Sequence, residues 1–411
     1  MQTADIIIIG AGPAGLSCAL QLAKLGISST LLEKEHFPRD KVCGDALSGK
    51  AIHVLRQLDE KWPDELESCG EALDSWGVTF VAPNRKQLRI PFYQGRKSNS
   101  SAPGLICKRI DFDAWLARKA MSSDLIDFRQ GAIVTAQHYT DGQWQLEVNG
   151  NKYLKAKLLI VATGAQSKIN CEISGFENKP SDLCAGIRTY FSGVQGLDKE
   201  NFIELHFLKN FLPGYLWIFP LPGDEVNIGL GMRSDILKNK KLNLRKELLS
   251  MIQKDPLLRE RFKDARQMAD IRGFSLPLGS KKRTISGDGF LLIGDTASLI
   301  DPFTGEGIGN AMMSGVIAAE TATDALNVNN FSASYLNNYD NCVYQKLWDE
   351  LKLSRKLQHL SAHASLFNFV VNRIRKSKKL RHLITLMFED IQMRKQLSKP
   401  FFYFKLLFRS P

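Results

Sequence analysis

The hydrophobic pattern at the start of the chain changes its period twice. Four consecutive isoleucines at residues 6–9 form a β-branched run that is typical of a buried parallel strand. A glycine-rich stretch follows at residues 10–15, and residues 16–23 then carry apolar side chains at helical spacing. A second β-rich run at residues 29–32 ends at Glu33. The pattern predicts a strand, a tight turn, a helix and a second strand.

This stretch resembles a membrane span in its length and its lack of charge, but not in its preceding residue or in its proline and glycines. Residues 6–23 contain no charged side chain, and a span needs about 20 apolar residues. Asp5 precedes the stretch where a signal peptide carries positive charge, and Pro13 and several glycines interrupt it. We therefore expect no membrane span here and a cytoplasmic protein.

Two later regions show other patterns. Apolar and polar residues alternate at 185–191, 203–208 and 226–231, which predicts an antiparallel sheet within residues 181–285. From about residue 332 onward the pattern is helical and few motifs remain.

Composition excludes several classes of protein. With 44% hydrophobic and 24% charged residues, the chain is neither disordered nor fibrous. The seven cysteines are scattered without CxxC pairs, so we expect a reducing compartment, no disulfide framework and no metal site.

Positive charge is concentrated at the C-terminus. The whole chain has a net charge of +12, and residues 371–411 hold eleven Lys and Arg against Glu389 and Asp390. A basic tail on a nearly neutral body favours an anionic membrane surface over nucleic acid, and it indicates peripheral attachment to the inner membrane face. The alternative is a helix packed on the body with a solvated basic face.

The glycine-rich turn has the sequence of a dinucleotide-binding motif. Gly10, Gly12 and Gly15 form a GxGxxG motif between the predicted strand and helix, and Glu33 follows at the end of the next strand. Such a turn allows close approach of a pyrophosphate, and the helix start offers free N–H groups to it. Glu33 is placed to bind ribose hydroxyls and would repel a 2′-phosphate, which disfavours NADP at this site.

Two further segments indicate which dinucleotide is bound. Residues 37–48 form a charged loop, FPRDKVCGDALS, where a nicotinamide dehydrogenase would have a plain helix. A strand near residue 290 ends in Gly294-Asp295, and residues 301–311 (DPFTGEGIGNA) open another apolar helix. Asp295 is placed to bind ribityl hydroxyls, and the turn at residues 305–310 presents N–H groups suited to a flavin.

Together these segments resemble the FAD-binding pattern of para-hydroxybenzoate hydroxylase-like flavoproteins, and the two loop motifs resemble the geranylgeranyl reductase family. The resemblance implies an α/β fold: a Rossmann-type FAD-binding domain interleaved with a mainly antiparallel substrate domain, plus a helical C-terminal region. We expect the FAD-binding domain at 1–70, 105–180 and 271–325, the substrate domain at 71–104 and 181–270, and the basic helical region at 326–411.

The resemblance also implies which residues contact FAD. Arg109 matches a family arginine at the flavin phosphate or ribityl chain; the alternative is a surface arginine that caps a helix. The expected contacts are Gly10, Gly12, Pro13, Ala14, Gly15, Glu33, Lys34, Arg39, Cys43, Gly44, Arg109, Asp295, Gly305, Gly307, Ile308, Gly309 and Asn310.

Three residues are expected to form the reaction cavity. Cys43 lies in the loop that the resemblance places near the isoalloxazine ring, where a thiol could position an alkene or supply a proton. Residues 215–220 (YLWIFP) resemble a family motif that lines the substrate cavity, and strand alternation puts Tyr215 and Trp217 on one face. An inert core thiol and a purely structural aromatic strand are the alternatives.

The expected activity is saturation of C=C bonds in a polyprenyl lipid or isoprenoid by hydride transfer from reduced FAD. Thr163 stands where the hydroxylases have Asp in a motif tied to NADPH, so the electron donor is left open between NAD(P)H and a ferredoxin-like protein. The alternatives are a flavin monooxygenase or halogenase, and a membrane-associated electron carrier to quinone.

Overall fold

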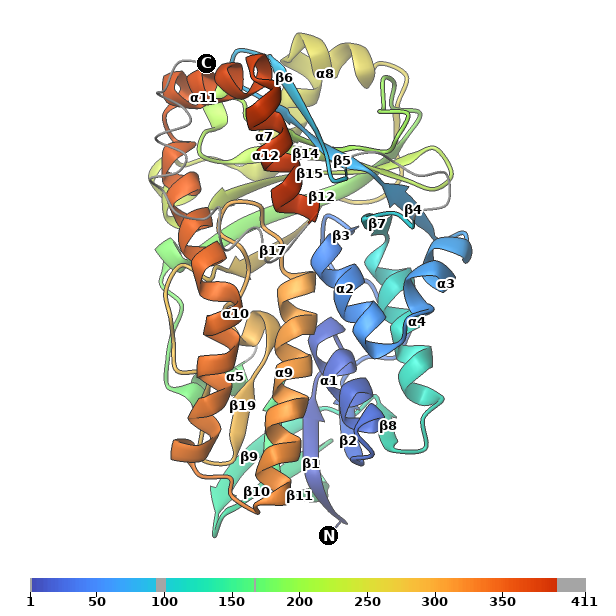
Figure 1. The fold of residues 1–411 in the computed structure, drawn as a ribbon, viewed down its shortest axis with the longest axis vertical. Coiled ribbons are helices and arrows are strands. Elements are labelled where there is room, and N and C mark those ends of the chain that lie inside the picture. Colours follow the sequence, from blue (N-terminus) through green and yellow to red (C-terminus); the bar gives the residue numbers. More distant parts are fainter. Residues whose placement is uncertain (1, 94–100, 166–167, 390–411) are drawn as a thin grey trace.

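The computed structural model describes residues 2–93, 101–165 and 168–389, and its first layer is a sheet with parallel strands at its centre (Figure 1). The strand order is β18-β19-β11-β1-β2-β8, and β10 and β9 extend from β11. The strands are β1 (Gln2–Ile9), β2 (Ser29–Glu33), β8 (Ile126–Gln130), β9 (Val134–Thr140), β10 (Gln143–Val148), β11 (Lys152–Val161), β18 (Ser286–Gly287) and β19 (Phe290–Leu292).

Strand β1 lies at the centre of this sheet, and its isoleucines are therefore buried. Ile6, Ile7 and Ile8 are fully buried, because β1 pairs in parallel with β11 on one side and with β2 on the other. Helices α1 (Pro13–Lys24), α4 (Arg109–Met121) and α9 (Ile308–Asn327) pack around it. This is the strand–turn–helix–strand arrangement that the N-terminal pattern predicts.

The second sheet is mainly antiparallel, and its order is β16-β12-β15-β14-β13-β5-β6, with β17 paired to β12. The predicted runs at 185–191, 203–208 and 226–231 fall largely in three of these strands. The strands are β5 (Gly77–Val81), β6 (Gln87–Pro91), β12 (Leu183–Ser192), β13 (Ile203–His206), β14 (Tyr215–Leu221), β15 (Glu225–Arg233), β16 (Arg266–Gln267) and β17 (Arg272–Pro277).

Short elements join the two sheets. A three-stranded sheet of β3 (Ala46–Leu47), β7 (Gly104–Cys107) and β4 (Ala72–Ser75) lies between them. Other helices before the C-terminal region are α2 (Gly49–Leu58), α3 (Trp62–Ser68), α5 (Lys168–Ser174), α6 (Ser234–Asn239), α7 (Leu244–Lys254) and α8 (Pro256–Arg261). The predicted α/β fold with an antiparallel second layer is confirmed. The domain boundaries stay a prediction, and β17, which a boundary at residue 271 assigns to the first layer, pairs with β12 in the second.

The C-terminal region is helical. Helix α10 (Ala333–Leu360) runs beside α9 along the long axis, and α11 (Ala364–Lys376) and α12 (Lys378–Glu389) lie at the far end, against β6 (Figure 1). Phe367, Val371 and Ile384 pack into the apolar cluster of the second sheet. The described part of the basic tail is therefore packed on the body, and residues 390–411 lie outside the described residues. None of the helices in the described part of the chain is long and apolar enough to cross a membrane.

Close packing of α9 on α1 depends on Gly315. A Cβ at Gly315 would lie 2.3 Å from the Ala14 carbonyl oxygen and 3.1 Å from the Cys18 nitrogen. Gly→Ala inside a helix ordinarily stabilises by about 0.5–1 kcal/mol. Here we expect Gly315→Ala to lower the free energy of unfolding by about 1–3 kcal/mol, because the helices must separate. Urea unfolding measures the change.

Glu320→Ala, at an exposed position of the same helix, is the matched control and should change stability little. A Gly315→Ala protein as stable as the wild type would contradict this account of the packing.

Candidate functional site

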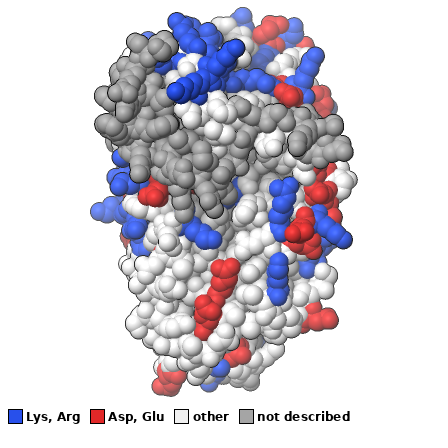
Figure 2. Space-filling view, viewed as in Figure 1, with Lys and Arg blue, Asp and Glu red and all other residues white. Residues whose placement is uncertain are grey.

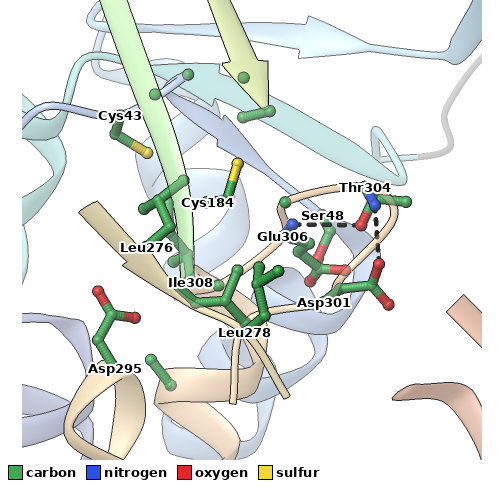
Figure 3. Close-up of a pocket in the computed structure, with 18 of the residues that line it drawn as sticks. Cys43, Ser48, Cys184, Leu276, Leu278, Asp295, Asp301, Thr304, Glu306 and Ile308 are labelled. Carbon is green, nitrogen blue, oxygen red and sulfur yellow. Dashed lines mark hydrogen bonds between the residues drawn. The ribbon is translucent and has the colours of Figure 1, made fainter. Parts of the chain in front are cut away.

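One large cavity lies between the two sheets. Its volume is about 1710 Å³, whereas a pocket for a single drug-sized ligand has about 300–1,000 Å³. Parts of the segments 9–14, 32–49 and 293–311 border one part of it, and the second sheet and the C-terminal helices border the rest. Figure 3 shows Cys43, Cys184 and Asp295 around this space, with Leu276 and Ile308 between them. The cavity has room for more than one ligand.

The glycine motif lies at one end of the cavity. Gly10 has a φ of +100°, and a Cβ there would lie 2.5 Å from the Ala162 carbonyl oxygen. A Cβ at Gly15 would lie 1.9 Å from the Gly10 oxygen, so both glycines serve close packing of α1 on the sheet. At Gly12 the nearest atom to a Cβ is an Arg39 nitrogen at 4.0 Å, so this backbone is open to the cavity. The turn fits a pyrophosphate at the start of α1, where Pro13 and Ala14 also line the cavity.

Glu33 and Arg39 form the next part of the site. Glu33 is buried, and its carboxylate accepts the Ala11 N–H at 2.8 Å and the Glu35 N–H at 3.1 Å. The Arg39 guanidinium donates to the Ala11 carbonyl at 3.0 Å and pairs with Asp113 at 2.9 Å. This places an acceptor and a cation beside the glycine turn, where a ribose and a pyrophosphate would lie. The predicted contact Lys34 borders the cavity with a side chain that is 70% exposed.

Arg109 is not the surface arginine of the alternative interpretation. It is buried at the start of α4, and its guanidinium donates two hydrogen bonds to Asp113, at 2.7 and 2.8 Å. It also lines the cavity, and its charge lies near the Cys43 thiol. Burial raises the pKa of Cys43, and the nearby Arg109 charge offsets this only in part. The thiol is therefore protonated at neutral pH.

The turn before α9 borders the cavity beside the aromatic strand, since its Thr304 carbonyl accepts a hydrogen bond from Tyr215. Asp295, Gly305, Gly307 and Ile308 line the cavity. Gly305 has a φ of +73°, and α9 begins directly after Gly307. The N–H groups of this first helical turn have no partner within the helix, so they can bind an acceptor.

Gly309 and Asn310 make packing contacts instead. A Cβ at Gly309 would lie 2.9 Å from the Cβ of Lys50 on α2. The Asn310 side chain donates to the Leu299 carbonyl at 2.8 Å and accepts from Lys50. Neither residue lines the cavity, so a cofactor contact is left only to their backbone N–H groups.

The aromatic strand borders the other end. Tyr215 and Trp217 lie on one face of β14 with Phe219, and their ring centroids are 6.2 and 6.4 Å apart along the row. All three line the cavity, which confirms that they share a face. The Tyr215 hydroxyl donates to the Thr304 carbonyl at 2.5 Å, and Trp217 Nε1 donates to the Asn227 side chain at 2.8 Å. Beyond them the lining is apolar and includes Val78, Ile90, Leu205, Phe303, Phe367 and Val371.

A buried polar cluster behind Cys43 was missed from the sequence. Asp45 is completely buried and accepts hydrogen bonds from Tyr190 at 2.9 Å and from Asn227 at 2.7 Å. Asp45 could have been found, because it lies two residues after Cys43 in the same loop. Tyr190 and Asn227 belong to ordinary strands without a motif, so only the tertiary structure brings them in.

Metal chemistry has no candidate cluster in the described ranges. Within residues 2–93, 101–165 and 168–389, no three His, Cys, Asp or Glu side chains group in a way that could hold an ion.

Comparison with known proteins places this chain in a family. Residues 4–201 match the family model described as pyridine nucleotide-disulphide oxidoreductase. A digeranylgeranylglycerophospholipid reductase from Methanocaldococcus jannaschii is 30% identical, and the match covers 87% of this chain and 87% of that protein. A menaquinone reductase from Mycobacterium tuberculosis is also 30% identical, over 78% of this chain and 76% of that protein.

Solved structures show the same fold. A geranylgeranyl bacteriochlorophyll reductase-like protein from Thermoplasma acidophilum superposes with a TM-score of 0.79 at 21% identity, covering 97% of this chain and 99% of that one. A flavin-dependent brominase superposes with a TM-score of 0.75 at 20% identity, covering 94% of each chain.

The position of Glu33 predicts its effect on the cofactor. We expect Glu33→Gln to weaken FAD binding about 10- to 100-fold, because hydrogen bonds to a charged acceptor contribute about 1.5–3 kcal/mol. Quenching of flavin fluorescence on titration of apoprotein measures the dissociation constant. Glu60→Gln, at an exposed position, is the control and should bind FAD like the wild type. Equal affinity of the Glu33→Gln protein would remove Glu33 from the cofactor site.

Proposed function

The chain belongs to the geranylgeranyl reductase family of FAD-dependent oxidoreductases, and from this premise we propose that it saturates C=C bonds of a polyprenyl lipid or isoprenoid. FAD is its cofactor. The proposal rests chiefly on one observation: a single cavity connects the dinucleotide turn at Gly12 with an apolar space beyond Trp217. A long hydrocarbon could enter that space, because its walls make few directional polar demands.

The reaction needs a hydride on one alkene carbon and a proton on its neighbour. Reduced FAD, when bound, supplies the hydride. Cys43 lines the cavity and holds a proton on its Sγ at neutral pH, so it is our candidate proton donor. Burial likewise raises the pKa of the Tyr215 hydroxyl, which stays protonated and fixed on the Thr304 carbonyl.

Orientation and exclusion of water are the other contributions of the protein. An unactivated alkene accepts hydride poorly, so it must be held close and in the right direction. Trp217 and Phe219 form a rigid aromatic wall for this purpose, and the Trp217 indole is held by Asn227. Electrons reach the flavin from an external donor, for which NAD(P)H and a ferredoxin-like protein are our two candidates.

Two competing functions predict different products. The brominase shares only the fold at its level of identity, and an oxygen-using enzyme would form a hydroxylated or halogenated product. The relative named menaquinone reductase favours a quinone with a prenyl tail as one substrate class. An electron carrier would reduce the quinone ring and leave the prenyl double bonds intact.

Reoxidation of reduced enzyme distinguishes these functions. We expect anaerobically reduced enzyme to be reoxidised by a polyprenyl lipid, with one or more double bonds saturated. Flavin absorbance follows the reoxidation, and mass spectrometry counts the added hydrogens. Reoxidation by oxygen alone, with a hydroxylated product, would overturn the proposal.

Cys43→Ala tests the proton donor in the same assay. We expect it to keep FAD and to slow substrate-driven reoxidation about 100-fold, within the range for loss of a general acid. Cys171→Ala, at an exposed position on α5, is the control and should keep the wild-type rate. A wild-type rate in Cys43→Ala would remove Cys43 from the reaction.

We also propose that the end of the molecule at α11 contacts an anionic membrane as a peripheral protein. Leu366 and Phe369 are 38% and 44% exposed, yet both also line the cavity, so its apolar end reaches the surface there. Six Lys and Arg follow at residues 373–381. Lys and Arg side chains gather at this end of the molecule (Figure 2). Exposed apolar residues beside cations suit an interface with anionic lipid.

Vesicle binding tests this surface. We expect the protein to co-sediment with phosphatidylglycerol vesicles and only weakly with phosphatidylcholine vesicles. Changing Lys376, Lys378 and Lys379 together to Gln should weaken binding by about two orders of magnitude, at about 1 kcal/mol for each charge. The same change at the exposed Lys61, Lys152 and Lys199 is the control. Equal binding to both kinds of vesicle would refute the proposal.

A further inference from the structure

Asp45 has an unusual position for a carboxylate. It directly follows Cys43 and Gly44, its side chain has no exposed surface, and its φ is +69°. Among residues with a side chain, Asp and Asn adopt this left-handed conformation most readily. The conformation brings Gly44 against the aromatic strand, where a Cβ would lie 2.9 Å from the Phe219 ring. The loop therefore fits closely against β14.

Donors from three elements surround the Asp45 carboxylate. Oδ1 accepts the backbone N–H of Arg109 at the start of α4, at 3.2 Å. Oδ2 accepts the Tyr190 hydroxyl of β12 at 2.9 Å and the Asn227 amide of β15 at 2.7 Å. The Arg188 guanidinium lies 4.4 Å from the Tyr190 ring centroid and pairs with Asp40 at 2.6 Å. A buried carboxylate thus joins the loop at Cys43 to two strands of the second sheet.

Asn227 carries this connection to the reaction cavity. Its amide nitrogen donates to Asp45 and to the Cys43 carbonyl, the latter at 2.8 Å. Its amide oxygen accepts from Trp217 Nε1 at 2.8 Å. Only one orientation of the amide satisfies all three contacts, since the nitrogen must face the carboxylate and the carbonyl. An ionised Asp45 therefore fixes Asn227, and Asn227 fixes the Cys43 backbone and the Trp217 indole.

We propose that Asp45 is a positioning residue: its carboxylate, through Asn227 and Tyr190, holds Cys43 and Trp217 in place at the cavity, and protonation of the carboxylate loosens both. The proposal rests on the reaction proposed above for Cys43 and Trp217, and it assigns to a fully buried carboxylate a role that acts through Asn227 and Tyr190. A protonated Asp45 carries its own O–H donor, but the groups around it are mainly hydrogen-bond donors. Protonation therefore weakens these hydrogen bonds.

The surroundings of Asp45 set the pH at which this happens. Burial raises the pKa of Asp45 to about 6, and hydrogen bonds from Asn227 and Tyr190 and the charge of Arg188 hold it from rising further. The other titratable groups near it are the thiols of Cys43 and Cys107 and the Tyr190 hydroxyl, and Arg109 faces it with its backbone N–H. Burial raises the pKa of both thiols and of Tyr190, so these three stay neutral over the same range.

Ionisation of Asp45 lowers the stability of the fold but raises the expected rate of the reaction. Because the folded pKa of about 6 lies above the ordinary 3.8 of Asp, the stability that protonated Asp45 contributes is lost as pH rises from 3.8 to about 6, and stability is level above that pH. The same ionisation forms the hydrogen bonds that position Cys43 and Trp217. We expect the rate of substrate-driven flavin reoxidation to rise with an apparent pKa of about 6.

Two variants test the proposal. Asp45→Asn should lose this limb of the pH–rate profile and react about 10- to 100-fold more slowly than the wild type at neutral pH, since small misplacements are costly. Tyr190→Phe removes one donor to the carboxylate, so it should shift the limb to higher pH. Asp264→Asn, at an exposed position, is the control and should keep the wild-type profile.

A second measurement needs no substrate. The urea midpoint of Asp45→Asn relative to the wild type should shift in favour of the variant as pH rises from 3.8 to about 6 and then level off, because only the wild type gains a buried charge. If wild-type enzyme reduces no alkene but this shift occurs, the reaction is wrong and the buried titration of Asp45 stands.

A pH–rate limb near 6 that persists unchanged in Asp45→Asn and in Tyr190→Phe would overturn the positioning role. If Asp45→Asn does not fold, Tyr190→Phe alone decides, since a merely structural contact would not move the limb.

Discussion

Close backbone packing around the glycine turn is the constraint on which the site depends. Gly15 brings α1 against the Gly10 carbonyl, and Gly315 brings α9 against the Ala14 carbonyl. The starts of α1 and α9, which lie far apart in sequence, therefore face the same cavity (Figure 1). Both helix starts offer unpaired N–H groups and a positive dipole. A side chain at Gly15 would push α1 away from the turn, and one at Gly315 would separate α9 from α1.

The cavity divides into a polar part and an apolar part, and the loop at residues 41–45 lies at their boundary. On the polar side Glu33 and Arg39 surround the glycine turn, and on the apolar side aromatic and aliphatic side chains extend to α11. A buried network at Asp45 crosses the boundary, because its partners come from both layers. Such an arrangement suits a cofactor whose ring must meet a hydrocarbon at a fixed distance.

The apolar part of the cavity reaches the surface at α11, next to the basic residues of the C-terminal region. The sequence shows a basic C-terminal tail, but it does not show that the described part of it covers the second sheet. In the structure α11 contributes Phe367 to the core and presents Leu366 and Phe369 at the surface. Basic residues follow directly in the chain. A lipid substrate would need such a junction to leave a bilayer without exposing its chain to water.

The sequence by itself determined the parts that depend on local spacing. The strand–turn–helix at Gly10–Gly15, the Glu33 acceptor and the shared face of Tyr215 and Trp217 follow from periodicities that neighbouring residues set. Only the tertiary structure decided that Arg109 is buried beside Cys43, that Gly309 and Asn310 pack against α2, and that Asp45 meets Tyr190 and Asn227. These contacts join residues far apart in the chain, and no local pattern encodes which distant side chains fold onto one point.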